Sequence, residues 1–199
     1  MNKKIYNALF IAFTAMGFCG SNDAGAQAVK SQANAVLLTD LSAFAAPPKN
    51  WQLAGNVSTG LDKTNQLSKE KGTGTLVNDV DEKNPGHDLF FNLQHGDIDL
   101  QMDFMMAKSS NSGIYLQGRY EIQLSDSWGT VNPRSSDNGG IYERWDDSKP
   151  DGQKGYEGHA PRQNVSRAPG LWQHIRISFQ APRFNDKGMK TTNAKILSI

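Results

Sequence analysis

Cysteine is nearly absent from this chain of 199 residues, whose single copy is Cys19. A lone thiol forms no internal disulfide and no cysteine-based metal site. An excess of charge is also lacking, because 21 Lys and Arg stand against 20 Asp and Glu, a net charge of +1. This balance argues against nucleic acid or an anionic membrane as the partner and fits neutral, polar ligands such as sugars better.

Long apolar runs are missing as well. The run from Ala8 to Phe18 is well short of the roughly 20 residues that a membrane span needs. It follows Lys3 and Lys4 and precedes small residues from Ala24 to Ala28, an order typical of a secretory signal peptide. We therefore predict a signal peptide over residues 1–28 and no membrane span.

Cleavage after Ala28 would remove Cys19 and leave a mature domain, residues 29–199, without a thiol nucleophile. It would also remove two lysines and one aspartate, so that nineteen basic and nineteen acidic residues remain. We expect an exported protein without disulfides to reside in a bacterial periplasm or at the cell surface. The alternative, a lipid attached to Cys19, is disfavoured by the bulky Phe18 directly before it.

Helical periodicity of useful length is absent too, and apolar residues recur with a period of two instead. Between His95 and Lys108 the alternating apolar residues are Ile98, Leu100, Met102, Phe104 and Met106. A later copy of the pattern consists of Ile175, Ile177 and Phe179, and residues 51–53 and 89–91 are shorter candidates. The sequence therefore predicts long, half-buried antiparallel strands.

The stretch from Ile114 to Leu124 has the same alternation in two unusually regular rows. The apolar row is Ile114, Leu116, Tyr120, Ile122 and Leu124, with Gly118 as a small gap or bulge. The opposite row, here called the polar row, is Tyr115, Gln117, Arg119, Glu121 and Gln123. We interpret the stretch as one strand, which spaces the polar row at about 7 Å along one face.

Residues 125–169 are rich in Gly, Asp, Asn and Pro and too long for a simple turn, so we expect this loop to carry function or to be disordered. Two packed sheets, an all-β sandwich of the jelly-roll kind, accommodate the long amphipathic strands best. The sequence stops at residues 194–199 within another strand pattern. We therefore expect a truncated chain that lacks its last strands.

Three motifs, NSGIYL (111–116), GRYEIQL (118–124) and DSW (126–128), closely resemble the signature of the 3-keto-disaccharide hydrolase domain. The similarity continues through residues 139–142, 164–173 and 179–184 and covers the chain from about residue 37 onward. It implies a concanavalin-like jelly roll, secretion and action on 3-keto-glucosides. In such families the domain continues past the equivalent of Ile199 with an Asn-Gly-Val turn, which is absent here.

The polar row offers what a carbohydrate site requires, namely donors and acceptors for hydroxyls and an aromatic ring for the sugar face. The alternative is a solvated strand with an Arg119–Glu121 surface pair, worth under about 1 kcal/mol. A retaining glycosidase needs two carboxylates about 5 Å apart. Gln123 and Ser125 follow Glu121 on its face, so the second carboxylate is missing and double displacement is disfavoured.

A 3-keto sugar, which the resemblance implies, needs only one base. Its ketone acidifies the hydrogen on C2, so a base removes that proton and the group on C1 leaves before water adds. We predict Glu121 as the base or a metal ligand, with Arg119 and Gln123 holding the sugar. His159, in the Gly- and Pro-rich loop, is the second candidate acid or base, with a solvated loop histidine as its alternative.

Aromatic residues of the long loop are candidates for stacking on a sugar, against ordinary packing beneath the loop: Trp128, Tyr142 and Trp145. Two acidic sets are candidates for a divalent cation: Asp97, Asp99 and Asp103, and Glu143, Asp146 and Asp147. A solvated face explains each set better. The metal ligands are therefore left unknown, no cofactor is certain, and a divalent cation stays open.

Taken together, the residues and the resemblance predict a secreted jelly-roll hydrolase or lyase that cleaves 3-keto-glucosides by elimination and hydration. Catalysis is assigned to Glu121 and His159, and sugar binding to Tyr115, Gln117, Arg119, Gln123, Trp128 and Tyr142. One alternative is a non-catalytic carbohydrate-binding module, and another is a structural domain whose polar row has no ligand. The partner is a small carbohydrate, and the oligomeric state is left open.

Overall fold

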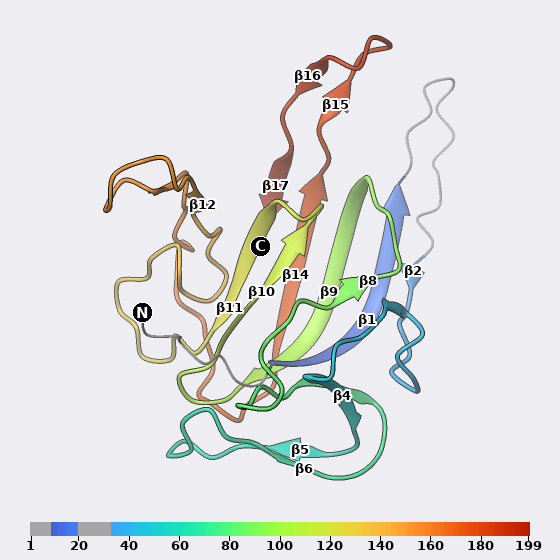
Figure 1. Ribbon diagram of the computed structural model, residues 1–199, viewed down its shortest axis with the longest axis vertical. Helices are drawn as coiled ribbons and strands as arrows, with labels where there is room; N and C mark the ends of the chain where they lie inside the picture. The colour runs from blue at the N-terminus through green and yellow to red at the C-terminus, as the bar shows by residue number, and fades with distance from the viewer. Residues whose placement is uncertain (1–8, 20–32) are drawn as a thin grey trace.

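The computed structural model describes residues 9–19 and 33–199, which form strands, turns and loops with no helix among them (Figure 1). Within these residues there is thus no helix of the length and hydrophobicity that crossing a membrane requires. The prediction of an all-β protein is confirmed, as the alternating apolar residues indicated.

The largest unit is an antiparallel sheet of seven strands in the order β17-β14-β9-β1-β7-β4, with β2 beside β1. From one edge to the other the strands are β17 (Lys195–Ser198), β14 (Gln173–Gln180), β9 (Asp97–Met106), β1 (Leu9–Cys19), β7 (Thr75–Asn78) and β4 (Trp51–Ala54); β2 is Ala33–Asn34. The strands expected around residues 98–106, 175–179 and 51–53 are therefore present.

Strands β9 and β14 give this sheet its main buried face. The alternating apolar residues of both strands belong to one core cluster: Ile98, Leu100, Met102, Phe104, Met106, Ile175, Ile177 and Phe179. Met105 and Ala107 point to the other face, where they pack with Val77 and the partly buried Trp172 in a second cluster. The period of two thus separates the two faces as predicted.

One sequence prediction is wrong here, because residues 111–124 form a hairpin and not a single strand. Its strands are β10 (Asn111–Leu116) and β11 (Tyr120–Ser125). Gln117 and Gly118 between them have left-handed φ angles of 52° and 63°. Positive φ at two successive residues is typical of tight hairpin turns, and glycine adopts it without strain.

The residues of the apolar row lie on one face of the hairpin although the chain reverses between them. Leu116 lies opposite Tyr120, and Ile114 lies opposite Ile122. Leu116, Ile122 and Leu124 are buried and pack in the core cluster of β9 and β14. The hairpin is therefore a second layer over the large sheet (Figure 1).

The second layer continues past β11 through residues of the long loop. Ile122 forms a bridge with Ile141, and Tyr142 N donates to Glu121 O at 2.9 Å. Ile141 in turn exchanges two backbone hydrogen bonds of 2.9 Å with His159. Two loop segments therefore extend the hairpin sideways, as short antiparallel additions to it.

The long loop, residues 125–169, is held by side chains near its start. Ser127 Oγ donates to Asp137 Oδ1 at 3.1 Å and accepts from Asn138 N at 2.9 Å. Asn164 Nδ2 donates to Ser127 O at 2.6 Å. These bonds fix the segment that leads into Ile141 and Tyr142, so the loop has a defined course through hydrogen bonds rather than through regular strands.

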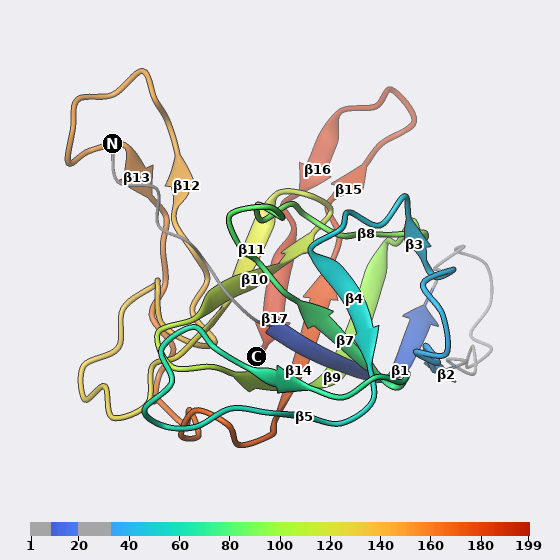
Figure 2. The ribbon, with the colours of Figure 1, turned by 60° about the horizontal axis from the view of Figure 1, so that its bottom comes forward.

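Four short strand pairs complete the fold: β3 (Phe44–Ala45) with β8 (Phe90–Phe91), β5 (Val57–Ser58) with β6 (Ser68–Lys69), β12 (Arg144–Trp145) with β13 (Gly155–Tyr156), and β15 (Arg183–Phe184) with β16 (Lys190–Thr192). Two of these pairs project from the body of the protein. Figures 1 and 2 show the β12–β13 hairpin, here called the arm, and the β15–β16 hairpin standing away from the large sheet.

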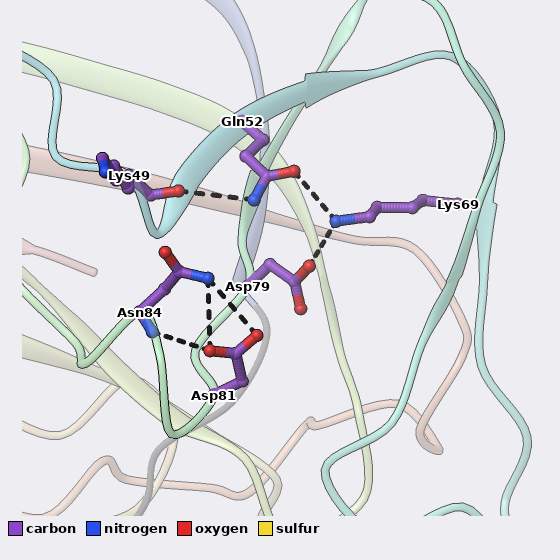
Figure 3. Close-up of polar contacts among 6 residues, drawn as sticks. All are labelled: Lys49, Gln52, Lys69, Asp79, Asp81 and Asn84. Atoms are coloured by element: carbon purple, nitrogen blue, oxygen red, sulfur yellow. Dashed lines mark hydrogen bonds and ion pairs between the residues drawn. The ribbon is translucent and has the colours of Figure 1, made fainter.

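A polar cluster ties β6 to the edge of the large sheet (Figure 3). Lys69 Nζ donates to Gln52 Oε1 of β4 at 2.9 Å and forms an ion pair with Asp79, which follows β7. Asp81 accepts hydrogen bonds from Asn84 in the turn beyond. Each charged group of this cluster has a partner within it, so the cluster serves to connect β6, β4 and the turn after β7.

Strand β1 lies within the predicted signal peptide, residues 1–28. It pairs with β9 along most of its length and with β7 at Phe10 and Ile11. The predicted cleavage position after Ala28 is outside the described residues, as is the basic start at Lys3 and Lys4. Processing of this segment therefore stays a prediction.

Candidate functional site

Glu121 lies on β11 directly opposite Tyr115 of β10. Tyr115 Oη donates to Glu121 Oε2 at 2.7 Å, and Gln123 Nε2 donates to Glu121 Oε1 at 2.9 Å. Directly opposed residues of an antiparallel pair share a face, which here is the face away from the core. Both carboxylate oxygens are therefore held by side chains that the hairpin itself positions.

Gly113 provides the room for this carboxylate. It lies opposite Gln123, two residues along β10 from Tyr115. A Cβ atom at Gly113 would lie 2.8 Å from Glu121 Cγ and 3.0 Å from its Cδ, closer than unbonded carbon atoms approach. The Glu121 side chain thus crosses β10 at the one position of this face that lacks a side chain.

The surroundings of Glu121 make it a stronger base than an ordinary carboxylate. Burial raises the pKa of the Glu121 carboxyl group, and the nearby charge of Asp88 raises it further. The hydrogen bonds from Tyr115 and Gln123 lower the pKa without cancelling the rise. A carboxylate with a raised pKa takes up a proton more readily than an ordinary one, which suits a general base.

Tyr115 donates a hydrogen bond to Glu121 and keeps its own proton. Burial raises the pKa of the Tyr115 phenol, and the hydrogen bond to Glu121 raises it further. The phenol therefore stays protonated at neutral pH and remains a donor to the carboxylate.

An open cavity of about 550 Å³ is lined by this carboxylate. Its lining combines acids, guanidinium groups and aromatic rings: Tyr115, Arg119, Glu121, Tyr142, Glu143, Arg144, Trp145 and Tyr156. Small-molecule sites typically have volumes of roughly 300–1,000 Å³. Hydrogen-bonding groups beside aromatic rings suit a sugar, which has hydroxyls at its rim and C–H groups on its faces.

Two parts of the structure form this cavity. The hairpin contributes the floor with Tyr115, Arg119 and Glu121. Tyr142 lies beside Glu121 through the 2.9 Å backbone hydrogen bond, so the chain enters the arm right next to the carboxylate. The wall is therefore made by residues 142–145 and by Tyr156, on the returning strand of the arm.

Charged groups brace the arm. The Arg144 guanidinium lies 5.2 Å and Lys149 Nζ 4.6 Å from the centre of the Tyr156 ring, within the range of cation–π attraction. Arg144 Nη1 also lies 3.1 Å from Glu157 Oε2. Trp145 donates through Nε1 to Asp147 at 3.0 Å, and its side chain is 60% exposed. Trp145 is thus the arm's exposed aromatic surface.

Arg119 is placed to hold an anionic or polar ligand. It closes the hairpin turn, with its backbone N donating to Leu116 O at 3.1 Å, and its side chain lines the cavity. Within the part of the chain that the structure describes, no carboxylate forms an ion pair with it. The alternative of an Arg119–Glu121 surface pair is therefore not formed.

The structure brings together five of the candidate sugar-site residues, Tyr115, Arg119, Glu121, Tyr142 and Trp145. It gives two members of the polar row other places. Gln117 lies in the turn and donates through Nε2 to His95 O at 3.2 Å. Gln123 is only 2% exposed, so in this arrangement it orients Glu121 and does not reach the cavity.

Two further predicted residues, Trp128 and His159, lie outside the cavity lining. The Trp128 side chain is 57% exposed on the long loop. His159 pairs with Ile141, which pairs with Ile122 of the apolar row, so the register places His159 on the face opposite to Glu121. The geometry therefore provides no partnership between His159 and Glu121.

The sequence interpretation missed Glu143, Arg144 and Tyr156 as neighbours of Glu121. The sequence offers Glu143 only as a candidate cation ligand, and the alternation on β11 contains no second carboxylate on the face of Glu121. These three residues reach the cavity because Tyr142 pairs with Glu121 and so directs the arm beside it. Local alternation contains no signal for that pairing. Two carboxylates, Glu121 and Glu143, thus line one cavity.

The two acidic sets do not gather into ligand clusters. In residues 9–19 and 33–199 no group of three or more His, Cys, Asp or Glu side chains is arranged to hold a metal ion. Arg183 binds Asp97 at 2.6 Å and 2.8 Å, and His174 Nδ1 lies 2.8 Å from Asp103 Oδ1. Asp97 and Asp103 therefore already have partners, on β15 and β14 respectively.

The sequence profile of the 3-keto-alpha-glucoside-1,2-lyase-like domain matches residues 40–194, which include every residue that lines the cavity. Comparison with curated proteins and with solved structures gave no match. The match agrees with the resemblance carried by the motifs in residues 111–128 and covers most of the chain. The chain therefore belongs to the 3-keto-alpha-glucoside-1,2-lyase-like domain family, a family of carbohydrate-active lyases and hydrolases.

Proposed function

We propose that this protein is a secreted enzyme that cleaves 3-keto-glucosides by elimination followed by hydration, with Glu121 as the base. One observation carries the proposal: a half-buried carboxylate with a raised pKa lines a cavity of hydroxyl-binding and aromatic side chains. The name of the family supports the substrate class. The basic start and apolar run of residues 1–28 support secretion.

The chemistry needs a base at C2 and stabilisation of the oxygen on C3. Glu121 removes the C2 proton that the ketone acidifies, and negative charge develops on the ketone oxygen as an enolate. Collapse of the enolate forms the C1–C2 double bond and expels the oxygen on C1. Water then adds to C1 while C2 regains a proton, so the net reaction is hydrolysis.

The neighbouring residues have distinct roles in this proposal. Tyr115 and Gln123 orient the carboxylate through their hydrogen bonds. Arg119 neutralises the enolate, since its guanidinium faces the cavity without a carboxylate partner among the described residues. The rings of Tyr142 and Trp145 stack on the sugar.

The second candidate is a carbohydrate-binding module without catalysis. The exposed aromatic rings of Tyr142 and Trp145 favour it, because stacking rings also occur in sites that only bind sugars. A carboxylate with a raised pKa suits a general base, whereas sugar binding alone does not require it. The two functions therefore differ in what the loss of this carboxylate does.

The test compares the wild type with Glu121→Gln on a chromogenic 3-keto-glucoside. We expect kcat to fall by about 10²–10⁴-fold, the usual contribution of a general base, while the affinity for the sugar changes little. Glu82→Gln, an exposed carboxylate outside the cavity, is the matched control and keeps full activity. A wild type that binds the sugar but releases no aglycone would identify a binding module.

Two additions sharpen this experiment. The same assay with a chelator measures whether a divalent cation takes part. Thermal unfolding of Glu121→Gln at neutral pH excludes misfolding as the cause of lost activity. Because the raised pKa means that the ionised carboxylate costs the folded state free energy at neutral pH, we expect the variant to unfold at the same temperature or higher.

A further inference from the structure

Glu143 is a second carboxylate in the cavity of Glu121. It follows Tyr142, whose backbone N donates to Glu121 O at 2.9 Å, so the two acids come from adjacent segments of the second layer. Glu121 belongs to the floor formed by the hairpin, and Glu143 to the wall at the base of the arm. A ligand in this cavity is thus flanked by two carboxyl groups.

The Glu143 side chain is held against Gly155 of the arm and Gly158 just beyond it. A Cβ atom at Gly158 would lie 2.5 Å from Glu143 Cγ, and one at Gly155 would lie 2.9 Å from its Cδ. Ser135 Oγ donates to Glu143 Oε1 at 3.4 Å. The carboxyl group therefore packs where the returning strand offers no side chains, and it keeps a hydroxyl donor at one oxygen.

No cation neutralises Glu143 within the described part of the chain. Its neighbour Arg144 is paired with Glu157 at 3.1 Å and lies over the Tyr156 ring. Among the described residues, Glu143 therefore has a hydroxyl donor but no ion-pair partner.

The other groups around the cavity are less suited to giving a proton to a leaving group. The Tyr115 phenol donates to Glu121. The Tyr156 ring has both Arg144 and Lys149 close to it. His159 belongs to the opposite face of the second layer. Glu143 is the lining carboxyl group that remains after Glu121.

We propose that Glu143 is a second catalytic residue, the acid that protonates the leaving oxygen and the base that later activates water. This inference rests on the proposed function. In the elimination, Glu121 takes the C2 proton, the C–H electron pair forms the C1–C2 double bond, and the C1–O bond breaks. The departing oxygen takes its proton from Glu143 and leaves as an alcohol.

The hydration step returns both residues to their starting states. Glu143, now a carboxylate, takes a proton from water as the water oxygen bonds to C1. The electron pair of the C1–C2 double bond moves to C2 and is shared with the ketone oxygen as an enolate. C2 then receives the proton held by Glu121. One water is consumed, one glycosidic bond is broken, and no oxidant or further reactant is required.

Leaving groups of different acidity test this role. 4-Nitrophenol leaves as an anion without help, whereas methanol needs a proton. We expect Glu143→Gln to lower kcat/KM about 10²-fold or more on a methyl 3-keto-glucoside, within the usual range for a general acid. On the 4-nitrophenyl substrate the same variant loses much less. Glu121→Gln lowers the rate on both substrates, because proton abstraction precedes both departures.

The controls separate the inference from the proposed function. Glu82→Gln, exposed and outside the cavity, retains wild-type rates on both substrates. Equal losses by Glu143→Gln on the two substrates, or none, would overturn the acid role of Glu143 while leaving the role of Glu121 intact. A wild type inactive on both substrates would refute the elimination itself.

Discussion

Two neighbours set the ionisation of Glu121 in opposite directions. The hydrogen bond from Tyr115 lowers the pKa of Glu121, whereas the charge of Asp88 raises it. We therefore expect Tyr115→Phe to raise this pKa and Asp88→Asn to lower it. Because the proposed base acts as a carboxylate, the acidic limb of kcat/KM against pH moves to higher pH in the first variant and to lower pH in the second.

Three pH–rate profiles measured under identical salt check these shifts. Asp62→Asn, an exposed carboxylate outside the cavity, is the control and leaves the limb in place. Movement of both variants in one direction would show that the limb reports a group other than Glu121. The shift caused by Asp88→Asn shrinks at high salt, because Asp88 is exposed to solvent.

At the residue scale, alternation predicted which side chains share a face but not what covers that face. The alternation placed Tyr115, Arg119 and Glu121 in one row, the resemblance favoured that row as the site, and the three side chains line one cavity. Gln123 shares their row, yet it is buried where the long loop pairs with its backbone through Gly139 and Gly140. Glu143 was missed for a related reason, since its place depends on contacts far along the chain. Local periodicity carries no information on such contacts.

At the scale of the hairpin, two glycines have separable tasks. Gly113 has no room for a side chain beside Glu121, whereas Gly118 has open space but a φ angle of 63°. We expect Gly113→Ala to displace Glu121 and to lower kcat/KM at least about 10-fold, since small misplacements of a catalytic group are costly. Gly118→Ala instead lowers the free energy of unfolding by about 1–2 kcal/mol, because alanine is strained in the left-handed region.

Denaturant unfolding and kinetics of both variants measure this separation. The Gly118→Ala protein keeps the wild-type kcat/KM under conditions where it is folded. Loss of activity without loss of stability in Gly118→Ala would mean that the turn itself, with Gln117 and Arg119, shapes the site.

The hairpin also shows how far an element can be predicted. The alternation in residues 111–124 is continuous, so it favoured one long strand. The Gln117–Gly118 pair between two alternating runs was the available signal for a turn. The face assignment survived the error because the connection has three residues, which places Leu116 opposite Tyr120 and keeps the parity of both rows.

At the scale of the molecule, the residues of β1 belong to the large sheet and also to the predicted signal peptide. The strand Leu9–Cys19 lies between β7 and β9, and cleavage after Ala28 would remove it. We expect a protein that begins at residue 29 to unfold at a lower temperature than the full chain, because β7 and β9 then have unpaired edges. Differential scanning calorimetry of the two proteins checks this.

A synthetic peptide of residues 9–19 extends the comparison. If β1 supplies the missing pairing, adding the peptide raises the unfolding temperature of the shorter protein, whereas a scrambled peptide does not. Identical unfolding temperatures for the two proteins would show that β1 adds nothing to the stability of the sheet.

The overall architecture was predictable to the level of an all-β protein with a core between long strands. The buried residues of β9 and β14 follow directly from their period of two. The order of strands does not, because pairing partners such as β9 and β14 are far apart in sequence and their alternation is the same. The strand order is therefore determined by tertiary contacts, because the local sequence pattern allows several pairings equally well.

The arm and the β10–β11 hairpin line different parts of the cavity. Glu121 and its two donors belong to a hairpin packed on the core, whereas Arg144, Trp145 and Tyr156 belong to a projecting loop whose tip contributes little to the core. Insertions or exchanges in such a loop cost little stability, so they can change the charged and aromatic lining of the cavity. The ligand preference of the cavity can thus change through the arm while the hairpin that holds Glu121 keeps its packing on the core.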